Sequence, residues 1–398
     1  MRVDILSREY PPDVYGGAGV HVAELAAALR ARDDIEANVR CFGDRRDEAG
    51  TTGYPPLAEL IDSNAAIRTL GTDLSMVDDC ADADLVHSHT WYANHAGQLA
   101  GMLHGIPHIV TAHSLEPLRP WKAEQLRGGY AISSWVERQA YENAARVIAV
   151  SDAMRADVLR CYPSIDPASV DVVRNGIDTD DWSPRVDRHR VRELGVDPDL
   201  PSIVFVGRVT RQKGLPHLLR AAKHLRPDVQ IVLCAGAPDT REIEREVEAL
   251  VEDLRSTHEQ VVWIPRMLPR SDVVALLTAA TVFVCPSVYE PLGIVNLEAM
   301  ACETAVVATA TGGIPEVVTD GKTGWLVPIE QVSDGTGTPV DVEGFERDLA
   351  DVLADALSDP VRAAEFGEAG RQRTVEEFSW DAVAARTVAV YRDVLGEV

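Results

Sequence analysis

A strand and the helix after it, at residues 203–225, decide the fold of this chain; the stretch reads IVFVGRVTRQKGLPHLLRAAKHL. The run of β-branched and aromatic residues at Ile203–Val206 predicts a buried strand. The apolar spacing in Leu215–Leu225 predicts a helix directly behind it. A strand that feeds a helix in this way is the repeating unit of a parallel sheet with crossover helices.

The same alternation runs through both halves of the 398-residue chain, which is too long for one ordinary core. In the first half we predict strands at residues 3–6, 38–42, 85–87, 109–112, 147–150 and 170–173. In the second half we predict strands at residues 203–206, 230–233, 261–264, 282–285, 305–308 and 325–328. The fold class is therefore α/β, with two Rossmann-like, doubly wound domains that face a central cleft at the carboxyl ends of their strands.

The domain boundaries follow from the polar, proline-containing segment at about 176–200, which we interpret as the linker. We place the N-terminal domain at residues 1–180 and the C-terminal domain at residues 181–375. Residues 376–398 are predicted to form a C-terminal helix that packs back on the N-terminal domain.

The net charge of −25 argues against nucleic acid and anionic membrane as partners, because both need a basic surface. Whether this acidity reflects a salt-adapted proteome or the acidic surface of a high-GC genome stays open. Six cysteines stand singly, which is typical of a reducing compartment and not of disulfides or a zinc site. Neither a signal-peptide layout nor a bilayer-length apolar run is present, so we predict a cytoplasmic location.

In so acidic a chain, well-placed cations are informative. Arg208 and Lys213 both follow the strand at residues 203–206, in the stretch GRVTRQKG. A guanidinium fork and an ammonium suit a pyrophosphate whose negative charge grows as it leaves. A solvated loop is the alternative, and the position between a buried strand and a helix favours the functional interpretation.

Two glutamates lie in the stretch EPLGIVNLE, after an apolar strand. Glu290 stands just before a predicted helix, while Glu298 lies two turns inside it, where a carboxylate needs a partner. The amides of Leu292, Gly293 and Ile294 open this helix and can hold a phosphate oxygen or a sugar hydroxyl. A helix-dipole carboxylate and a buried ion pair are the structural alternatives for the two glutamates.

A double glycine, Gly16-Gly17, lies between the first strand and the helix after it, where the backbone can approach a diphosphate. Its spacing, GGAG, is not the GxGxxG of nicotinamide-binding units, and a simple tight turn is the alternative. Three histidines, His87, His89 and His113, follow strand ends in the same domain. A metal site and packing in the core are the alternatives for these histidines. We predict that they bind no metal and that His113 contacts the donor sugar.

Taken together, GRVTRQKG, EPLGIVNLE and GGIPE resemble the GT-B glycosyltransferases of family 4, close to the bacterial glycogen synthases. The stretches PPDVYGGAGVH, VHSHTWY, TAHSLEPLRPWK and NGID are most similar to the actinobacterial branch. The resemblance implies a retaining hexosyltransferase that moves glucose from a nucleotide-diphosphate glucose, with ADP-glucose favoured over UDP-glucose. The acceptor would be the 4-hydroxyl of an α-glucan or of glucose 1-phosphate, the latter giving maltose 1-phosphate.

The resemblance also implies roles for single residues. Gly16 and Gly17 would contact the donor diphosphate, and Arg208 and Lys213 its distal phosphate. Glu298 would bind the ribose, Glu290 the transferred sugar, and His113 would lie beside the reacting carbon. No cofactor is implied beyond the nucleotide sugar, and a homodimer is one option for the assembly. Candidates on the acceptor side are Glu9, Tyr15, His89 and Trp91.

Two departures from the larger glycogen synthases leave the acceptor open. This chain has Tyr15 where they have a lysine before the double glycine, and Thr90 where they have an aspartate before the tryptophan. The alternatives are another donor or acceptor within family 4, a nucleotide-sugar 2-epimerase, a lipid-directed mannosyltransferase, and a sugar-binding protein without turnover. The acidic charge disfavours the lipid-directed enzyme.

Overall fold

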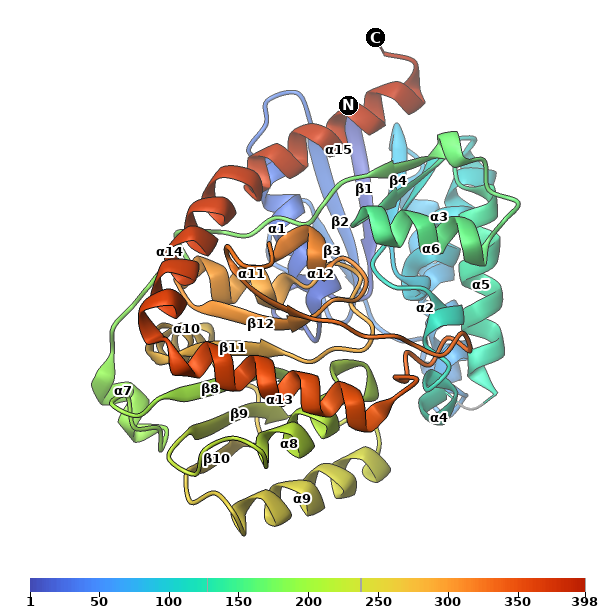
Figure 1. Ribbon diagram of the computed structural model, residues 1–398. Coiled ribbons are helices and arrows are strands. Elements are labelled where there is room, and N and C mark those ends of the chain that lie inside the picture. Colours follow the sequence, from blue (N-terminus) through green and yellow to red (C-terminus); the bar gives the residue numbers. More distant parts are fainter. Residues whose placement is uncertain (127, 237, 398) are drawn as a thin grey trace. The chain divides into compact units, whose positions relative to one another are not determined.

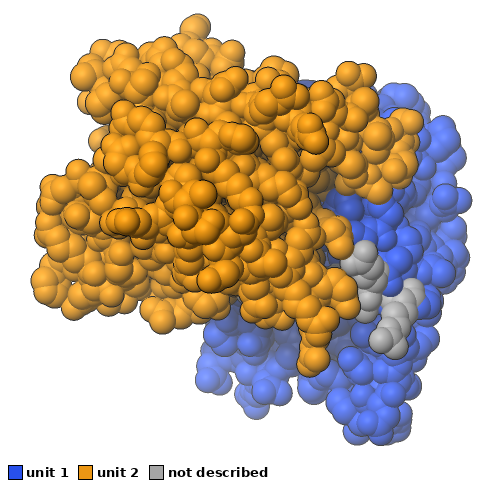
Figure 2. Space-filling model, turned by 60° about the horizontal axis from the view of Figure 1, so that its bottom comes forward, with its two compact units in different colours: residues 1–176, 380–398 blue, residues 177–379 orange. Residues whose placement is uncertain are grey.

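The computed structural model describes residues 1–126, 128–236 and 238–397. Contacts within the chain divide it into two compact units, coloured separately in Figure 2. Unit 1 comprises Met1–Gly176 together with Trp380–Val398, and unit 2 comprises Ile177–Ser379. The chain therefore leaves unit 1 after Gly176 and returns to it at Trp380. The sequence predicts these two boundaries at 180/181 and 375/376.

Within the described residues, unit 1 is built on a seven-stranded parallel sheet with the order β3-β2-β1-β4-β5-β6-β7. Figure 1 labels strands β1, β2, β3 and β4 of this sheet. Its strands are β1 (Arg2–Ser7), β2 (Glu36–Phe42), β3 (Thr51–Tyr54), β4 (Leu85–His89), β5 (His108–Ala112), β6 (Arg146–Ala149) and β7 (Val170–Val172). Its helices are α1 (Gly17–Arg30), α2 (Ala65–Val77), α3 (Trp91–His104), α4 (Lys122–Leu126), α5 (Gly129–Asn143), α6 (Asp152–Cys161) and α15 (Trp380–Leu395).

Both faces of the unit 1 sheet are covered, as a parallel sheet requires. One face packs Val3 and Ile5 of β1 against Leu25 of α1 and Tyr391 of α15. The other face packs Leu6 and its neighbours against α2 and α3. Because side chains alternate along a strand, adjacent residues of β1 serve the two cores. Helix α15 is thus part of the hydrophobic core of unit 1.

Unit 2 has, within the described residues, a six-stranded parallel sheet with the order β10-β9-β8-β11-β12-β13. Its strands are β8 (Ser202–Arg208), β9 (Gln230–Gly236), β10 (Val261–Ile264), β11 (Val282–Cys285), β12 (Ala305–Thr309) and β13 (Gly324–Val327). Its helices are α7 (Arg188–Glu193), α8 (Leu215–Ala222), α9 (Arg241–Arg255), α10 (Arg270–Ala279), α11 (Ile294–Ala301), α12 (Ile314–Val317), α13 (Val342–Ser358) and α14 (Pro360–Glu377).

The main core of unit 2 joins Ile203 and Phe205 of β8 to the apolar faces of α8, α9 and α13. Helices α10 and α11 contact the strands too, and α11 packs against α14. Among the described residues, no helix is both long and apolar enough to cross a bilayer.

All twelve strands predicted from the sequence are present in the structure. The sequence prediction missed β3, which pairs with β2 at the edge of the unit 1 sheet. Its sequence, TTGY, has no apolar run to mark it. The structure also starts α1 at Gly17, so the second glycine of the double glycine lies inside the first turn of that helix.

Candidate functional site

An ion pair links two of the predicted donor residues in unit 2. Lys213 Nζ lies 2.7 Å from Glu290 Oε2, and the same oxygen accepts a hydrogen bond of 3.1 Å from Ser287 Oγ. Burial pulls the pKa of Lys213 down, but the Glu290 carboxylate outweighs it, and the pKa of Lys213 is raised above its usual value. Lys213 is therefore a fixed positive charge at the carboxyl edge of the sheet.

The backbone around this pair is held by very close approaches. Gly214, with φ +64°, passes so near Pro286 that a Cβ on it would lie 1.9 Å from the Pro286 carbonyl oxygen. Gly312, with φ +54°, would place a Cβ 2.0 Å from the carbonyl oxygen of Glu290. The amide of Gly313 donates to that same carbonyl at 2.9 Å. Only glycine fits at Gly214 and Gly312, so the GGIPE turn supports the backbone of Glu290.

Arg208 ends β8, and its Nη1 donates to Asp239 Oδ1 at 2.9 Å. Asp239 holds the guanidinium at the carboxyl edge that also carries Lys213. The sequence prediction named Arg208 but not this partner, because Asp239 follows a different strand, β9.

Glu298 lies partly buried in α11. Burial raises its pKa to about 7, while the nearby positive charges of Arg270 and Lys213 oppose that rise. The sequence predicted that this carboxylate needs a partner, yet within the described residues Glu298 forms no ion pair. The ion pair with Lys213 is formed by Glu290 instead.

Asn296 is a candidate site residue that the sequence prediction did not name. It is fully buried in α11 between the two glutamates, and among the described residues neither Oδ1 nor Nδ2 has a hydrogen-bond partner. A buried unpaired amide is costly, and a functional site is a common reason for one. Helix α11 begins at Ile294 with Gly293 as its N-cap, so Leu292, which the sequence prediction placed at the helix start, lies just before the helix.

In unit 1 the glycine loop is closed by a carboxylate of the chain itself. Glu9 Oε2 accepts hydrogen bonds from the amides of Tyr15, at 2.8 Å, and Gly16, at 2.7 Å. The amide of Gly16, which we predicted to contact the donor diphosphate, is therefore already bonded in this structure. Glu9 lies where an anion would bind at the start of α1.

Four histidines cluster where β4, β5 and α1 meet. His89 Nδ1 and His113 Nε2 share a hydrogen bond of 2.9 Å, and His21 Nδ1 donates to Asn175 Oδ1 at 2.8 Å. His87 bonds Tyr391 of α15 and Thr111 of β5, so its role is structural. Burial holds the pKa of all four rings below the usual value, to about 4 for His21, so they are neutral at pH 7.

Two buried ring nitrogens of this cluster, His21 Nε2 and His89 Nε2, have no hydrogen-bond partner among the described residues. His21, His89 and His113 have ligand atoms within 4.8 Å of one another, so this set could hold a metal ion. The bond between His89 and His113 competes with that use.

The remaining acceptor-side candidates have different surroundings. Tyr15 is half exposed, whereas Trp91 is buried at the start of α3, with its ring 4.2 Å from that of Tyr92. Thr90, just before Trp91, has φ +63° and ψ 160°, a backbone region that is strained for a residue with a side chain. The structure brings His89 and His113 together, and the indole nitrogen of the buried Trp91 has no hydrogen-bond partner among the described residues.

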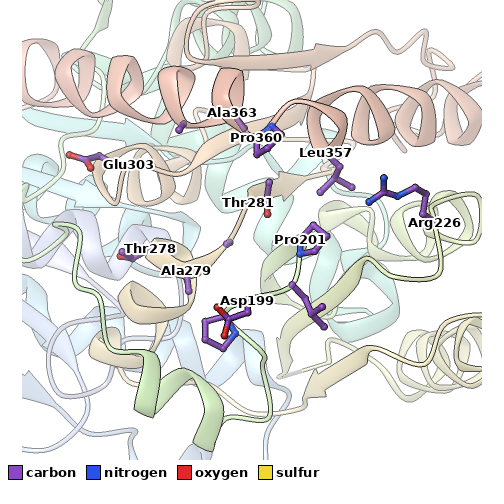
Figure 3. A pocket seen from close by; sticks show the side chains of 14 residues that line it. Asp199, Pro201, Arg226, Thr278, Ala279, Thr281, Glu303, Leu357, Pro360 and Ala363 are labelled. Atoms are coloured by element: carbon purple, nitrogen blue, oxygen red, sulfur yellow. The ribbon is translucent and has the colours of Figure 1, made fainter.

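A pocket of about 550 Å³ lies elsewhere in unit 2 and is drawn in Figure 3. Pro201 and Thr281, which line it, directly precede β8 and β11. The pocket is thus at the amino edge of the sheet, opposite the edge that carries Lys213 and Glu290. It is separate from the candidate site.

Two parallel sheets with cations and carboxylates at their carboxyl edges are the arrangement expected of a GT-B glycosyltransferase, and the comparisons with known proteins show that class. Residues 188–373 match the family model "Glycosyl transferases group 1", and residues 15–181 match "Glycosyltransferase Family 4". The chain belongs to this family of glycosyltransferase enzymes, as the sequence motifs predicted.

The chain is 55% identical to the alpha-maltose-1-phosphate synthase of Mycolicibacterium smegmatis, over 99% of this chain and 100% of that protein. It is 29% identical to the glycogen synthase of Mycobacterium tuberculosis, over 98% of this chain and 94% of that protein. Among solved structures, sucrose-phosphate synthase from Thermosynechococcus elongatus shares the fold, with a TM-score of 0.80, 23% identity and full coverage of both chains. The predicted GT-B fold is confirmed.

Proposed function

We propose that this enzyme is a retaining glucosyltransferase that moves glucose from ADP-glucose to the 4-hydroxyl of glucose 1-phosphate, and so makes maltose 1-phosphate. The observation that carries the proposal is the 55% identity, over the whole chain, to a protein named for that product. The glycogen synthase relative is more distant, at 29% identity. An α-glucan acceptor is therefore the second candidate.

The donor side of the proposal rests on unit 2. Lys213 and Arg208 are two cations at one sheet edge, each held in place by a carboxylate, Glu290 and Asp239. A diphosphate can exchange for one carboxylate contact on each cation, because both bonds lie at the ends of flexible side chains. The amides that open α11 add donors for its oxygens. Glu298, with a pKa near 7, would accept hydrogen bonds from the ribose hydroxyls.

The proposed reaction breaks the bond between C1 of the glucose and the diphosphate oxygen, and forms a bond from C1 to O4 of the acceptor on the same face. The proton of the 4-hydroxyl passes to the departing diphosphate oxygen. Lys213 and Arg208 stabilise the charge that grows on that oxygen, which is transition-state stabilisation by fixed charges. Glu290 would hold hydroxyls of the transferred glucose.

On the unit 1 side, His113 and His21 support the sugar-binding part of the proposal. Both rings are neutral at pH 7, so each can accept or donate a hydrogen bond without adding charge. The lone pair of His21 Nε2 is an acceptor that faces no described donor. His113 is only partly buried, so it is the ring that a hydroxyl of the glucose would contact.

One assay tests the proposal directly. ADP-glucose and UDP-glucose are each offered with glucose 1-phosphate or with glycogen, and products are identified by mass and by the anomeric proton coupling. We expect a disaccharide phosphate with a new α-linkage, formed fastest from ADP-glucose.

Other products would favour other members of the family. Chain extension of glycogen without a disaccharide phosphate would support the glucan acceptor, and conversion of the donor alone would support an epimerase. A β-linked product would contradict retention. Donor binding without turnover on any acceptor would refute the proposal.

A further inference from the structure

Three cations gather at the carboxyl edge of the unit 1 sheet. Arg8 directly follows β1, whereas Arg119 and Lys122 both follow β5. Strand β4 lies between β1 and β5 in the sheet and leads into Tyr92, in the first turn of α3. Because parallel strands end at the same edge, these residues from three neighbouring strands come together there.

Tyr92 is the common contact of two of the cations. The guanidinium carbon of Arg8 lies 4.1 Å from the centre of the Tyr92 ring, and Lys122 Nζ lies 5.4 Å from it. An aromatic face attracts a cation and fixes its position but does not neutralise its charge. Arg8 and Lys122 are thus held in place with their positive charge intact.

The cluster is short of negative charge. Neither Arg8 nor Arg119 forms an ion pair with any carboxylate in the described parts of the chain. Arg119 Nη1 donates to Ser114 Oγ at 3.0 Å, and its Nε is buried without a partner among the described residues. A buried guanidinium nitrogen without an acceptor is costly, and an oxygen atom of an added anion would be one acceptor for it.

The carboxylates of Glu116 and Glu137 both act on Lys122, but the contact with Glu116 is a loose one. Its Nζ is 3.5 Å from Glu116 Oε1, which is longer than a normal hydrogen bond. The other oxygen of Glu116 is taken by Ser133 Oγ at 2.6 Å. Burial first, and the charge of Arg119 second, lower the pKa of Lys122 to about 8. The charges of Glu116 and Glu137 oppose this shift without cancelling it, so an added anion would favour the charged form of Lys122.

We propose that Arg8, Arg119 and Lys122 bind the phosphate group of a phosphorylated sugar acceptor and thereby select it over a neutral glucan. A phosphate monoester offers three outer oxygens, which suit two guanidinium groups and an ammonium. The sugar part of this assignment rests on the proposed glucosyl transfer. The binding of a phosphate monoester rests on the cation cluster alone.

The test compares Arg119→Gln and Arg8→Gln with the unaltered full chain. Lys122 is left in place because its removal would leave the buried Glu116 unpaired. With ADP-glucose as donor, we expect each variant to raise the KM for glucose 1-phosphate by about tenfold or more, since a charged hydrogen bond is lost. The KM for the donor and the turnover of glycogen should change less than about twofold.

The control variant is Arg68→Gln, another unit 1 arginine that bonds only backbone oxygens, those of Ile61 and Ser63, among the described residues. It should leave every constant unchanged. The proposal would be overturned if Arg119→Gln and Arg8→Gln lost equal activity with glucose 1-phosphate and with glycogen. It would also be overturned if the KM for glucose 1-phosphate did not change in these variants.

A binding arm separates this inference from the proposed function. Glucose 1-phosphate and glucose are titrated calorimetrically into each protein without donor. Tighter binding of glucose 1-phosphate, weakened about tenfold by Arg119→Gln and unaffected by Arg68→Gln, would support the phosphate site even if no acceptor were glucosylated. Equal affinity for glucose and glucose 1-phosphate would refute the site even if transfer were observed.

Discussion

At the scale of single residues, Lys213 and Glu290 hold each other in place through their ion pair. We predict that Lys213→Ala and Glu290→Ala each lower kcat by about 100-fold or more, because each removes a fixed charge or hydrogen-bonding group from the donor site. Either single change also leaves a partly buried charge without its partner, which reduces stability. Steady-state kinetics and thermal unfolding of both variants measure the two effects separately.

The double variant, Lys213→Ala with Glu290→Ala, distinguishes chemistry from folding. It removes both charges, so its stability should recover relative to the single variants while its activity stays lost. Lys223→Ala is the matched control, since Lys223 pairs with Asp253 on the surface of the same unit. Recovery of activity in the double variant would show that the single variants failed by misfolding.

The buried histidines predict a loss of stability in acid. Burial lowers the pKa of His21 to about 4 and of His108 to about 3, below the value of an unfolded chain. As the pH falls from 6.5 to 5, the unfolded chain gains protons that the folded chain does not accept. Each such histidine then costs about 2 kcal/mol of unfolding free energy, and stability is fully present only above about pH 6.5.

Denaturant unfolding between pH 5 and 7 checks this prediction. His108→Gln should make the unfolding free energy less dependent on pH, since glutamine can still donate to Ser88 but does not titrate. His189→Gln, at an exposed position, should not alter that dependence. A free energy of unfolding that does not fall toward pH 5 would contradict the buried neutral state of the rings.

Sequence reasoning predicted the residue types of the candidate site better than their partners. Arg208, Lys213 and Glu290 follow strand ends in a recognisable pattern, so their place at one edge could be predicted. The partners Asp239 and Ser287, the unpaired Asn296 and the cation cluster around Tyr92 could not. Those contacts join side chains from different strands, and only the register and the packed helices bring them within bonding distance.

At the scale of elements, the turn that opens α12 predicts a sharp difference between two glycines. Gly312→Ala should cost at least about 2 kcal/mol more than Gly321→Ala, because its Cβ would overlap the Glu290 carbonyl. Gly321 also has a positive φ, +68°, but a Cβ added there would meet no described atom within 4 Å, so only backbone strain opposes that substitution. Chemical denaturation of both variants measures the difference, and equal costs would show that the turn can shift.

Most strands could be predicted from the sequence, because buried parallel strands consist of runs of apolar residues. Strand β3 is the exception, and it shows why some elements could not be predicted. Its Gly53 is required because a Cβ would meet the Asp44 carbonyl oxygen at 1.8 Å. The position of β3 is therefore determined by contact with neighbouring backbone, and no local sequence pattern indicates the strand.

At the scale of the whole molecule, the net charge of −25 predicts self-repulsion that salt relieves. We expect the Tm to rise by a few degrees as KCl increases from about 0.05 to about 0.5 M, because screening shortens the range of the repulsion. The KM for both phosphorylated substrates should rise over the same range. Differential scanning calorimetry and steady-state kinetics over the same KCl series test these two expectations. A Tm that falls with added salt would mean that attractive ion pairs dominate. Peak activity at low salt would exclude obligate salt adaptation.

The return of the chain to unit 1 has a consequence for protein synthesis. Trp380, Val383 and Tyr391 of α15 complete the core of unit 1, yet the ribosome makes them only after residues 177–379. At ordinary translation rates that interval lasts roughly 10–40 s, during which the β1 face of the first sheet has no α15 to cover it. The unit that starts first is thus finished last, and a nascent chain stalled before residue 380 would expose apolar surface to chaperones and proteases.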